Sequence, residues 1–110
     1  MADKKKVLHV EDDTRWTDIV RRNLEEAGYE VSSFDTLPAA KQAADSEPFD
    51  YFICDGRVGP VDATEWAIEL FEEGRKVVSL SGMAFTPKGM ANMSKGQYDG
   101  DKLVAMLNSL

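Results

Sequence analysis

The chain has 110 residues, 43% of them hydrophobic, so it is long enough to bury a core and is predicted to form one domain over residues 1–110. Its net charge of −7 argues against a nucleic-acid partner, because binding driven by phosphate neutralisation needs a basic face. No apolar run is long enough for a signal peptide or a membrane span, and the single cysteine, Cys54, cannot form an internal disulfide. We therefore expect a cytoplasmic protein with no membrane partner.

Short apolar runs alternate along the chain with segments of helical periodicity, a pattern that predicts a βαβ architecture. The predicted strands are residues 7–10, 29–34, 49–54, 77–80 and 90–94. Helices are predicted in the first three intervals and at the end of the chain, the second of them over residues 36–45. Between residues 82 and 93 a long helix is not expected, because Gly82, Pro87 and Gly89 interrupt the segment.

The residues that flank these helices are typical of helix ends. Gly28 is expected to end the first helix, Asp62 to cap the third with Glu65 at the capping-box position, and Asp99 to cap the last. The side chains expected on buried helix faces are Trp16, Ile19, Val20, Asn23, Leu24, Ala27, Trp66, Ala67, Leu70, Leu103, Met106, Leu107 and Leu110. His9 is expected to be a satisfied sheet residue, because it has no partner at metal-ligand spacing.

Polar side chains follow the predicted strand ends. Right-handed crossovers would join the strands into a parallel sheet covered on both faces, and chemistry in such sheets lies beyond the carboxyl ends of the strands. The side chains at those positions are Glu11, Asp12, Asp13, Asp55, Ser81 and Lys95. We therefore expect carboxylates, a hydroxyl and an ammonium to converge at one edge of the sheet.

Each of these residues also has an ordinary structural explanation: the acids could cap a helix, Asp55 could start a turn, and Lys95 could be a solvated lysine. Together they indicate more, because clustered carboxylates repel one another unless a cation lies among them. Mg²⁺ favours such oxygen ligands, and Mn²⁺ is the second candidate. With the ion and a lysine present, an incoming phosphoryl group would be neutralised and an aspartate could act as the nucleophile.

These residues resemble the response-regulator receiver domains of two-component signalling, and the resemblance covers nearly the whole chain. It is carried by the acid pair in HVEDD (9–13), the aspartate in FICDGRV (52–58), the hydroxyl in SLSG (79–82), the lysine in MSKG (93–96) and the first helix, IVRRNLEEAGY (19–29). The resemblance implies an α/β fold of the three-layer doubly wound, flavodoxin-like kind, with a five-stranded parallel sheet in the order 2-1-3-4-5.

The resemblance also implies a role for each site residue. Asp55 would be the phosphoacceptor, with Ser81 and Lys95 contacting the phosphoryl group. Mg²⁺ would be held by Glu11, Asp12, Asp55 and the backbone carbonyl of Arg57. The implied donor is a sensor histidine kinase or a phosphotransfer protein, and the chain would catalyse at most its own phosphorylation and dephosphorylation. Without a DNA-binding segment after residue 110, we do not expect a transcription factor, and the sequence makes no prediction of oligomeric state.

The sequence departs from the family in the region after Ser81. Only 14 positions separate Ser81 from Lys95, so the family's fourth helix is expected to be shortened or missing. Asn92 stands where the family has its switch aromatic, Gly96 follows the lysine in place of proline, and the proline after the acceptor is displaced to Pro60. The output of such a domain would then need another route, for which Phe85 and Tyr98 are candidates.

Two other functions stay open. The first is a degenerate receiver that would serve as a protein-interaction module without phosphorylation. The second is an enzyme on the same fold. The acids after the first strand would repel a flavin phosphate, and a phosphatase of the Asp-x-Asp kind would need a second acid where Arg57 stands.

Overall fold

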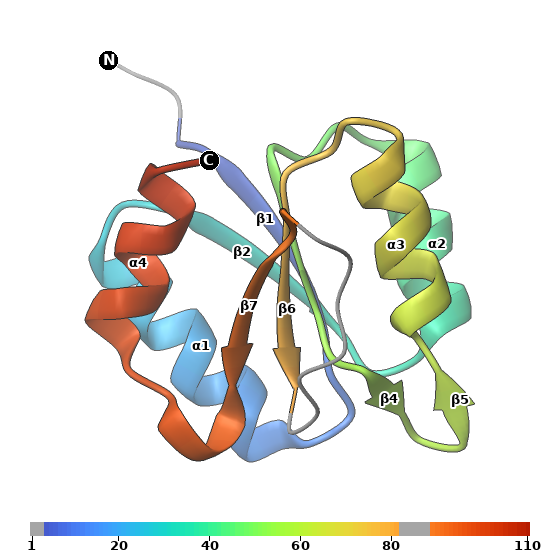
Figure 1. Cartoon of the computed structure of the whole chain (residues 1–110), viewed down its shortest axis with the longest axis horizontal. Helices are drawn as coiled ribbons and strands as arrows, with labels where there is room; N and C mark the ends of the chain where they lie inside the picture. The colour runs from blue at the N-terminus through green and yellow to red at the C-terminus, as the bar shows by residue number, and fades with distance from the viewer. Residues whose placement is uncertain (1–3, 82–88) are drawn as a thin grey trace.

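The computed structural model of the chain describes residues 4–81 and 89–110, and its centre is a parallel sheet in the order β2-β1-β3-β6-β7 (Figure 1). These strands are β1 (Lys6–Val10), β2 (Glu30–Phe34), β3 (Tyr51–Cys54), β6 (Val77–Ser81) and β7 (Ala91–Ser94). Every neighbouring pair in the sheet is parallel. Counted among the sheet strands alone, this arrangement confirms the predicted order 2-1-3-4-5.

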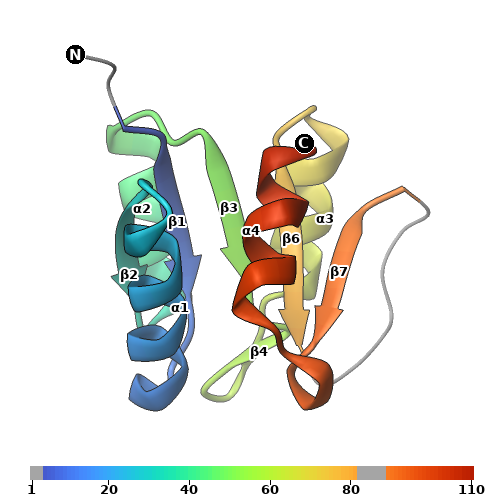
Figure 2. The same cartoon turned by 90° about the vertical axis from the view of Figure 1, so that its left-hand side faces the viewer.

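Helices cover both faces of the sheet, which confirms the three-layer, flavodoxin-like architecture (Figure 2). The α-helices of the described residues are α1 (Thr14–Glu26), α2 (Leu37–Ser46), α3 (Thr64–Glu72) and α4 (Gly100–Asn108), and a 3-10 helix, η1 (Lys95–Gln97), precedes the last of them. Helices α1 and α4 lie on one face, α2 and α3 on the other. Residues 82–88, where the shortened fourth helix was expected, lie outside the described part of the chain.

Strand alternation divides the apolar side chains into two cores. In β1, Leu8 and Val10 pack towards α2 and α3 with Phe52 and Trp66, whereas Val7 packs on the other face. That other core joins α1 and α4 to the sheet through Val20, Leu24, Ile53, Leu103 and Leu107. The central strands are therefore buried on both sides, as their nearly continuous apolar sequences predict. No helix in residues 4–81 and 89–110 is both long and apolar enough to span a membrane.

The predicted helix ends are confirmed at two positions and wrong at one. Gly28 lies just past α1 with φ +95°, and Asp99 caps α4 by accepting from the N–H groups of Asp101 and Lys102. Asp62 does not cap α3, which begins at Thr64 with Ala63 at the N-cap. Asp62 belongs instead to a β-ribbon that the sequence did not predict.

That ribbon is a pair of two-residue antiparallel strands, β4 (Arg57–Val58) and β5 (Val61–Asp62), which lies between Asp55 and α3. Asp62 pairs with Arg57 there, and its carboxylate accepts from the Thr64 N–H at 2.9 Å. The helix consequently starts later than the capping pattern suggested.

Some side chains predicted to be buried are not. Ile19 and Leu110 are 42% and 36% exposed, and Ala27 is also exposed. Trp16 is only half-buried, whereas Trp66 is a core residue as predicted. Helical periodicity identifies the buried side of α1, but Ile19 lies beyond the margin of the stripe that contacts the sheet. Leu110 lies past the end of α4 at Asn108.

Candidate functional site

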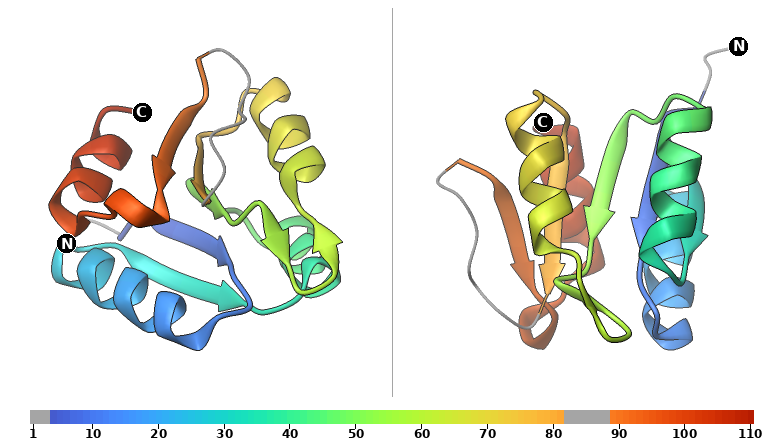
Figure 3. Two further views of the ribbon diagram at one scale, coloured as in Figure 1. Left: turned by 60° about the horizontal axis from the view of Figure 1, so that its bottom comes forward. Right: turned by 90° about the vertical axis from the view of Figure 1, so that its right-hand side faces the viewer.

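The carboxyl ends of the parallel strands meet at one edge of the sheet, and the predicted site residues follow them (Figure 3). Val10 pairs with Cys54 in adjacent strands, so the next residues, Glu11 and Asp55, leave the sheet side by side. Ser81 pairs with Ser94 at the ends of β6 and β7, which brings the backbone of Lys95 to the same edge. Strand register alone therefore gathers residues from distant parts of the sequence.

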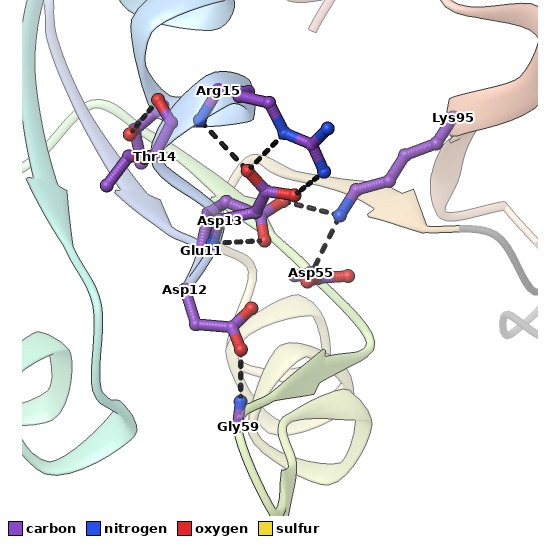
Figure 4. Close-up of polar contacts among 9 residues, drawn as sticks. Glu11, Asp12, Asp13, Thr14, Arg15, Asp55, Gly59 and Lys95 are labelled. Carbon is purple, nitrogen blue, oxygen red and sulfur yellow. Dashed lines mark hydrogen bonds and ion pairs between the residues drawn. The ribbon is translucent and has the colours of Figure 1, made fainter.

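The ammonium of Lys95 lies between two of the carboxylates (Figure 4). Its Nζ is 2.5 Å from Glu11 Oε1 and 3.2 Å from Asp55 Oδ2. Glu11 and Asp55 are 1% and 7% exposed, so both ion pairs form away from bulk water, where charge interactions are stronger. The predicted convergence of Lys95 with the acids of the first and third strands is thus present in the structure.

Three acids form a cluster at this edge of the sheet. One carboxylate oxygen from each of Glu11, Asp12 and Asp55 lies within 4.8 Å of the others. The single ammonium leaves two negative charges of the ionised cluster without compensation, which a divalent cation would neutralise. The donor set is all oxygen, so these residues fit Mg²⁺.

Burial gives Glu11 an unusual proton affinity. Loss of solvation is the main reason that the pKa of its carboxyl is raised to about 7; Lys95 acts in the opposite direction and the nearby Asp55 adds to the rise. The Asp13 backbone N–H donates to Glu11 Oε2 at 3.2 Å. A buried carboxyl with a pKa near 7 is costly to ionise unless a cation compensates its charge. Such strongly shifted pKa values are typical of functional sites.

Asp13 does not belong to the cluster, and the capping explanation is correct for it. It is the N-cap of α1, and its carboxylate accepts from the Arg15 backbone N–H at 2.9 Å and from the Arg15 Nε and Nη2 at 3.2 and 2.9 Å. The Arg15 guanidinium accordingly lowers the pKa of Asp13 to about 2. Both oxygens are engaged, and Asp13 orders the start of the helix beside the site.

The β4–β5 ribbon contributes to the site through its turn. The Gly59 N–H donates to Asp12 Oδ2 at 2.9 Å, and Gly59 has φ +61°, which favours glycine. Arg57, two residues after Asp55, begins β4 and has an exposed side chain, while the ligand role of its carbonyl stays a prediction. Ser81 ends β6, and its side chain lies outside what the structure describes.

Two aromatic residues near Lys95 were not predicted to belong to the site. The Trp16 ring lies 5.3 Å from Lys95 Nζ, and the Tyr98 ring meets Trp16 edge-on at 5.3 Å. The prediction that Trp16 is a core residue is wrong. Its helical spacing could not show that the first turn of α1 lies beside the carboxyl ends of the strands. That turn follows directly after the acid pair, which is the signal that could have indicated it.

His9 is buried in β1, but the prediction that its polar atoms are satisfied is wrong. Its Nδ1 and Nε2 have no hydrogen-bond partner among the described residues. Burial, with smaller contributions from Lys95 and Arg21, lowers the pKa of the imidazole to about 3, so the ring is neutral. Cys54, directly before Asp55, is also buried, and burial raises the pKa of its thiol to about 12.

No family model matches this sequence, and no curated protein is significantly similar to it. Solved structures do match. A receiver domain protein from Methanospirillum hungatei has 23% identity and a TM-score of 0.85, covering 97% of this chain and 93% of that chain. The chemotaxis protein CheY4 of Vibrio cholerae has 21% identity and a TM-score of 0.82, covering 97% and 98%.

A third similar structure is a response regulator protein from Burkholderia pseudomallei, solved with a phosphorylated aspartic acid, a calcium ion and citrate. It has 20% identity and a TM-score of 0.81, and the alignment covers 94% of this chain and 66% of that chain. At such low identity the likeness concerns the fold and leaves the activity open. The chain has the fold of response-regulator receiver domains.

Proposed function

We propose that this chain is a phosphoacceptor domain of a two-component or phosphorelay system, in which Asp55 accepts a phosphoryl group. The observation that carries the proposal is the contact of Lys95 Nζ with Glu11 and Asp55 at the edge where Asp12 also lies. A receiver fold alone would not require an acid cluster and an ammonium at this edge.

The proposed reaction moves one phosphoryl group from a phosphohistidine of a sensor kinase or phosphotransfer protein. A carboxylate oxygen of Asp55 attacks phosphorus, the new O–P bond forms, and the N–P bond of the donor breaks. The leaving imidazole nitrogen takes a proton from solvent. Lys95 pairs with a phosphoryl oxygen and Ser81 is proposed to donate a hydrogen bond to another, so this chain supplies position and charge.

The residues that would hold Mg²⁺ or Mn²⁺ are Glu11, Asp12, Asp55 and the Arg57 carbonyl. When bound, the ion neutralises charge on the transferring group and on the acids that receive it. Asp12 is already oriented by the Gly59 N–H, and Glu11 by the Asp13 N–H. The Burkholderia response regulator, which has the same fold and was solved with a phosphorylated aspartic acid and a calcium ion, supports the proposal.

The chain would act as a stoichiometric acceptor in the cytoplasm, catalysing at most its own phosphorylation and dephosphorylation. The buried, unpaired Cys54 is compatible with a reducing compartment.

The test is incubation with acetyl phosphate and Mg²⁺ followed by intact-mass measurement. We expect the mass gain of one phosphoryl group in the wild type and none in Asp55→Asn. Asp45→Asn, an exposed acid on α2, is the matched control and should gain phosphate like the wild type. No gain in the wild type, or an equal gain in Asp55→Asn, would contradict the proposal.

A degenerate receiver is the second candidate, and Asn92 favours it. Asn92 lies in β7 paired with Ser79, and its Oδ1 is buried without a hydrogen-bond partner among the described residues. An amide at this position cannot reproduce the swing of the family's aromatic ring. This candidate predicts that Asp55→Ala leaves partner binding unchanged, whereas the phosphoacceptor function predicts that phosphorylation alters it.

A further inference from the structure

We propose that Trp16 is a positioning residue for Lys95: its indole face holds the Lys95 ammonium over the acid cluster, and Tyr98 and Asn23 hold the indole in place. The inference rests on the proposed function, because it assigns to Trp16 a role in phosphoryl transfer through Lys95. Phosphoryl transfer to Asp55 does not itself require an aromatic ring beside the lysine.

The ammonium of Lys95 lies close to the ring of Trp16. Lys95 Nζ lies 5.3 Å from the centroid of Trp16, inside the distance of about 6 Å at which a cation is attracted to an indole face. The Lys95 side chain is 19% exposed, so the contact is partly desolvated. A lysine side chain has several rotatable bonds, and a ring on its open side reduces the positions that the ammonium can take.

The indole of Trp16 is a partner of Lys95 that does not change during the proposed reaction. Glu11 and Asp55 contact the ammonium in the described structure, but both belong to the acid cluster that fits a divalent cation. Asp55 also loses its free carboxylate when it becomes esterified. The neutral indole keeps its attraction for the ammonium throughout, so it can hold Lys95 while the carboxylates exchange partners.

Tyr98 and Asn23 hold the indole of Trp16 in place. Tyr98, which follows η1, meets Trp16 edge-on with ring centroids 5.3 Å apart and an interplanar angle of 80°. Its hydroxyl donates to Asn23 Oδ1 at 2.6 Å. Trp16 and Asn23 are seven residues apart on α1, which is about two turns and places them on one side of the helix. Tyr98 therefore bridges two positions of α1.

The first residue of α4 packs against Asn23, which accepts the hydrogen bond from Tyr98. A Cβ at Gly100, the first residue of α4, would lie 2.6 Å from Asn23 Oδ1 and 2.7 Å from its Cγ. Any larger residue at position 100 would displace the amide that accepts the Tyr98 hydroxyl. The start of α4 thus has the one residue type that lets Asn23, Tyr98 and Trp16 pack together.

The kinetic test compares substitutions at Trp16 in phosphorylation by acetyl phosphate with Mg²⁺. Trp16→Leu removes the ring face while keeping an apolar side chain, and we expect a rate constant lower by about 3- to 30-fold, the range of a cation–π contact. Trp16→Phe should recover most of the loss, because it restores a ring face. Trp66→Phe, a tryptophan change in the core between the sheet and the helices α2 and α3, is the control and should keep the wild-type rate.

A structural role alone would predict a different result. In that case Trp16→Phe and Trp16→Leu would lose rate only in proportion to their loss of stability, measured by urea unfolding. Equal rates in Trp16→Leu and the wild type would overturn the inference while leaving the proposed function intact. If the wild type itself gained no phosphate, the proposed function would fail. The fluorescence of Trp16 would then test the contact between Trp16 and Lys95 by itself.

That measurement is the fluorescence of Trp16 in a Trp66→Phe background, where it is the only tryptophan. Lys95→Met removes the ammonium, and we expect the emission of Trp16 to change in intensity and wavelength. Tyr98→Phe keeps the ring and loses the bond to Asn23, so it should change the emission less than Tyr98→Leu. Identical emission with and without the Lys95 ammonium would overturn the inference.

Discussion

At the scale of single residues, the site is defined by which polar groups are left without a partner and which are paired. His9 and Glu11 lie two positions apart in and after β1, and both are fully buried, yet only Glu11 has a cation beside it. A buried charge or polar group needs such compensation, so the two residues have different consequences for stability.

His9→Leu is expected to leave the free energy of unfolding unchanged or to raise it by about 1 kcal/mol at pH 7. The ring nitrogens of His9 have no partner among the described residues, so an apolar side chain of similar size loses no hydrogen bond. Leu8→Ala, at the next and equally buried position, should instead lose about 3 kcal/mol by opening a cavity. Urea unfolding measures both, and a loss well above 1 kcal/mol for His9→Leu would show that its nitrogens are satisfied.

The acid cluster gives a second prediction at this scale. Asp12→Asn removes one charge but keeps an oxygen that can accept from the Gly59 N–H. Without divalent ions we expect the variant to be at least as stable as the wild type, because repulsion with Glu11 and Asp55 is reduced. At a Mg²⁺ concentration a hundred times its Kd, the wild type should gain about 2.7 kcal/mol of unfolding free energy and the variant much less.

Urea unfolding with and without Mg²⁺ checks this prediction, and Asp45→Asn is the control that should respond like the wild type. Equal gains in the wild type and Asp12→Asn would show that Asp12 does not hold the ion.

The three acids and Lys95 could be predicted from the sequence because strand ends in a parallel sheet meet at one edge. Trp16 could not, because a residue on an apolar helical stripe gives the same pattern whether it faces the core or the strand ends.

At the scale of elements, the corner between η1 and α4 joins the site to α1. The Tyr98 hydroxyl donates to Asn23, and burial together with the neighbouring Asp99 raises the pKa of Tyr98 to about 12. The hydroxyl is therefore protonated and able to donate over the whole neutral range.

This shift predicts a loss of stability at high pH. Below pH 10, the usual pKa of a tyrosine, the phenol is protonated in both the folded and the unfolded chain, and its contribution is complete. Between pH 10 and about 12 the unfolded phenol ionises first, so the folded state loses stability as the pH rises. Tyr98→Phe should lack this part of the decline; parallel curves for the two proteins, followed by urea unfolding against pH, would contradict it.

Helices and sheet strands could be predicted because each is a long periodic or continuously apolar segment. The β4–β5 ribbon could not, since two-residue strands have no periodicity of their own and depend on a distant contact, the Gly59 bond to Asp12. The shift of the α3 start from Asp62 to Thr64 follows from the same ribbon. Local capping rules predict a helix end correctly only where no tertiary contact takes up the capping residue, as at Asp99.

At the scale of the whole molecule, the parallel topology determines which residues can meet. Glu11, Asp55 and Lys95 come from the first, middle and last parts of the chain, and only the order β2-β1-β3-β6-β7 with its register places them together. Alternating strands and helices predicted the parallel sheet, while the order of the strands followed from the resemblance to receiver domains. The expectation of a single domain and the role of residues 82–88 remain predictions.

The most direct test of the central claim is to determine which residue carries the phosphoryl group. After reaction with acetyl phosphate and Mg²⁺, borohydride reduces an acyl phosphate to an alcohol, which marks the modified aspartate as homoserine in a peptide mass spectrum. We predict homoserine at position 55 and no such conversion at Asp12 or Asp45. Conversion at another acid, or none at Asp55 in a folded wild-type protein, would contradict the assignment of Asp55 as the phosphoacceptor.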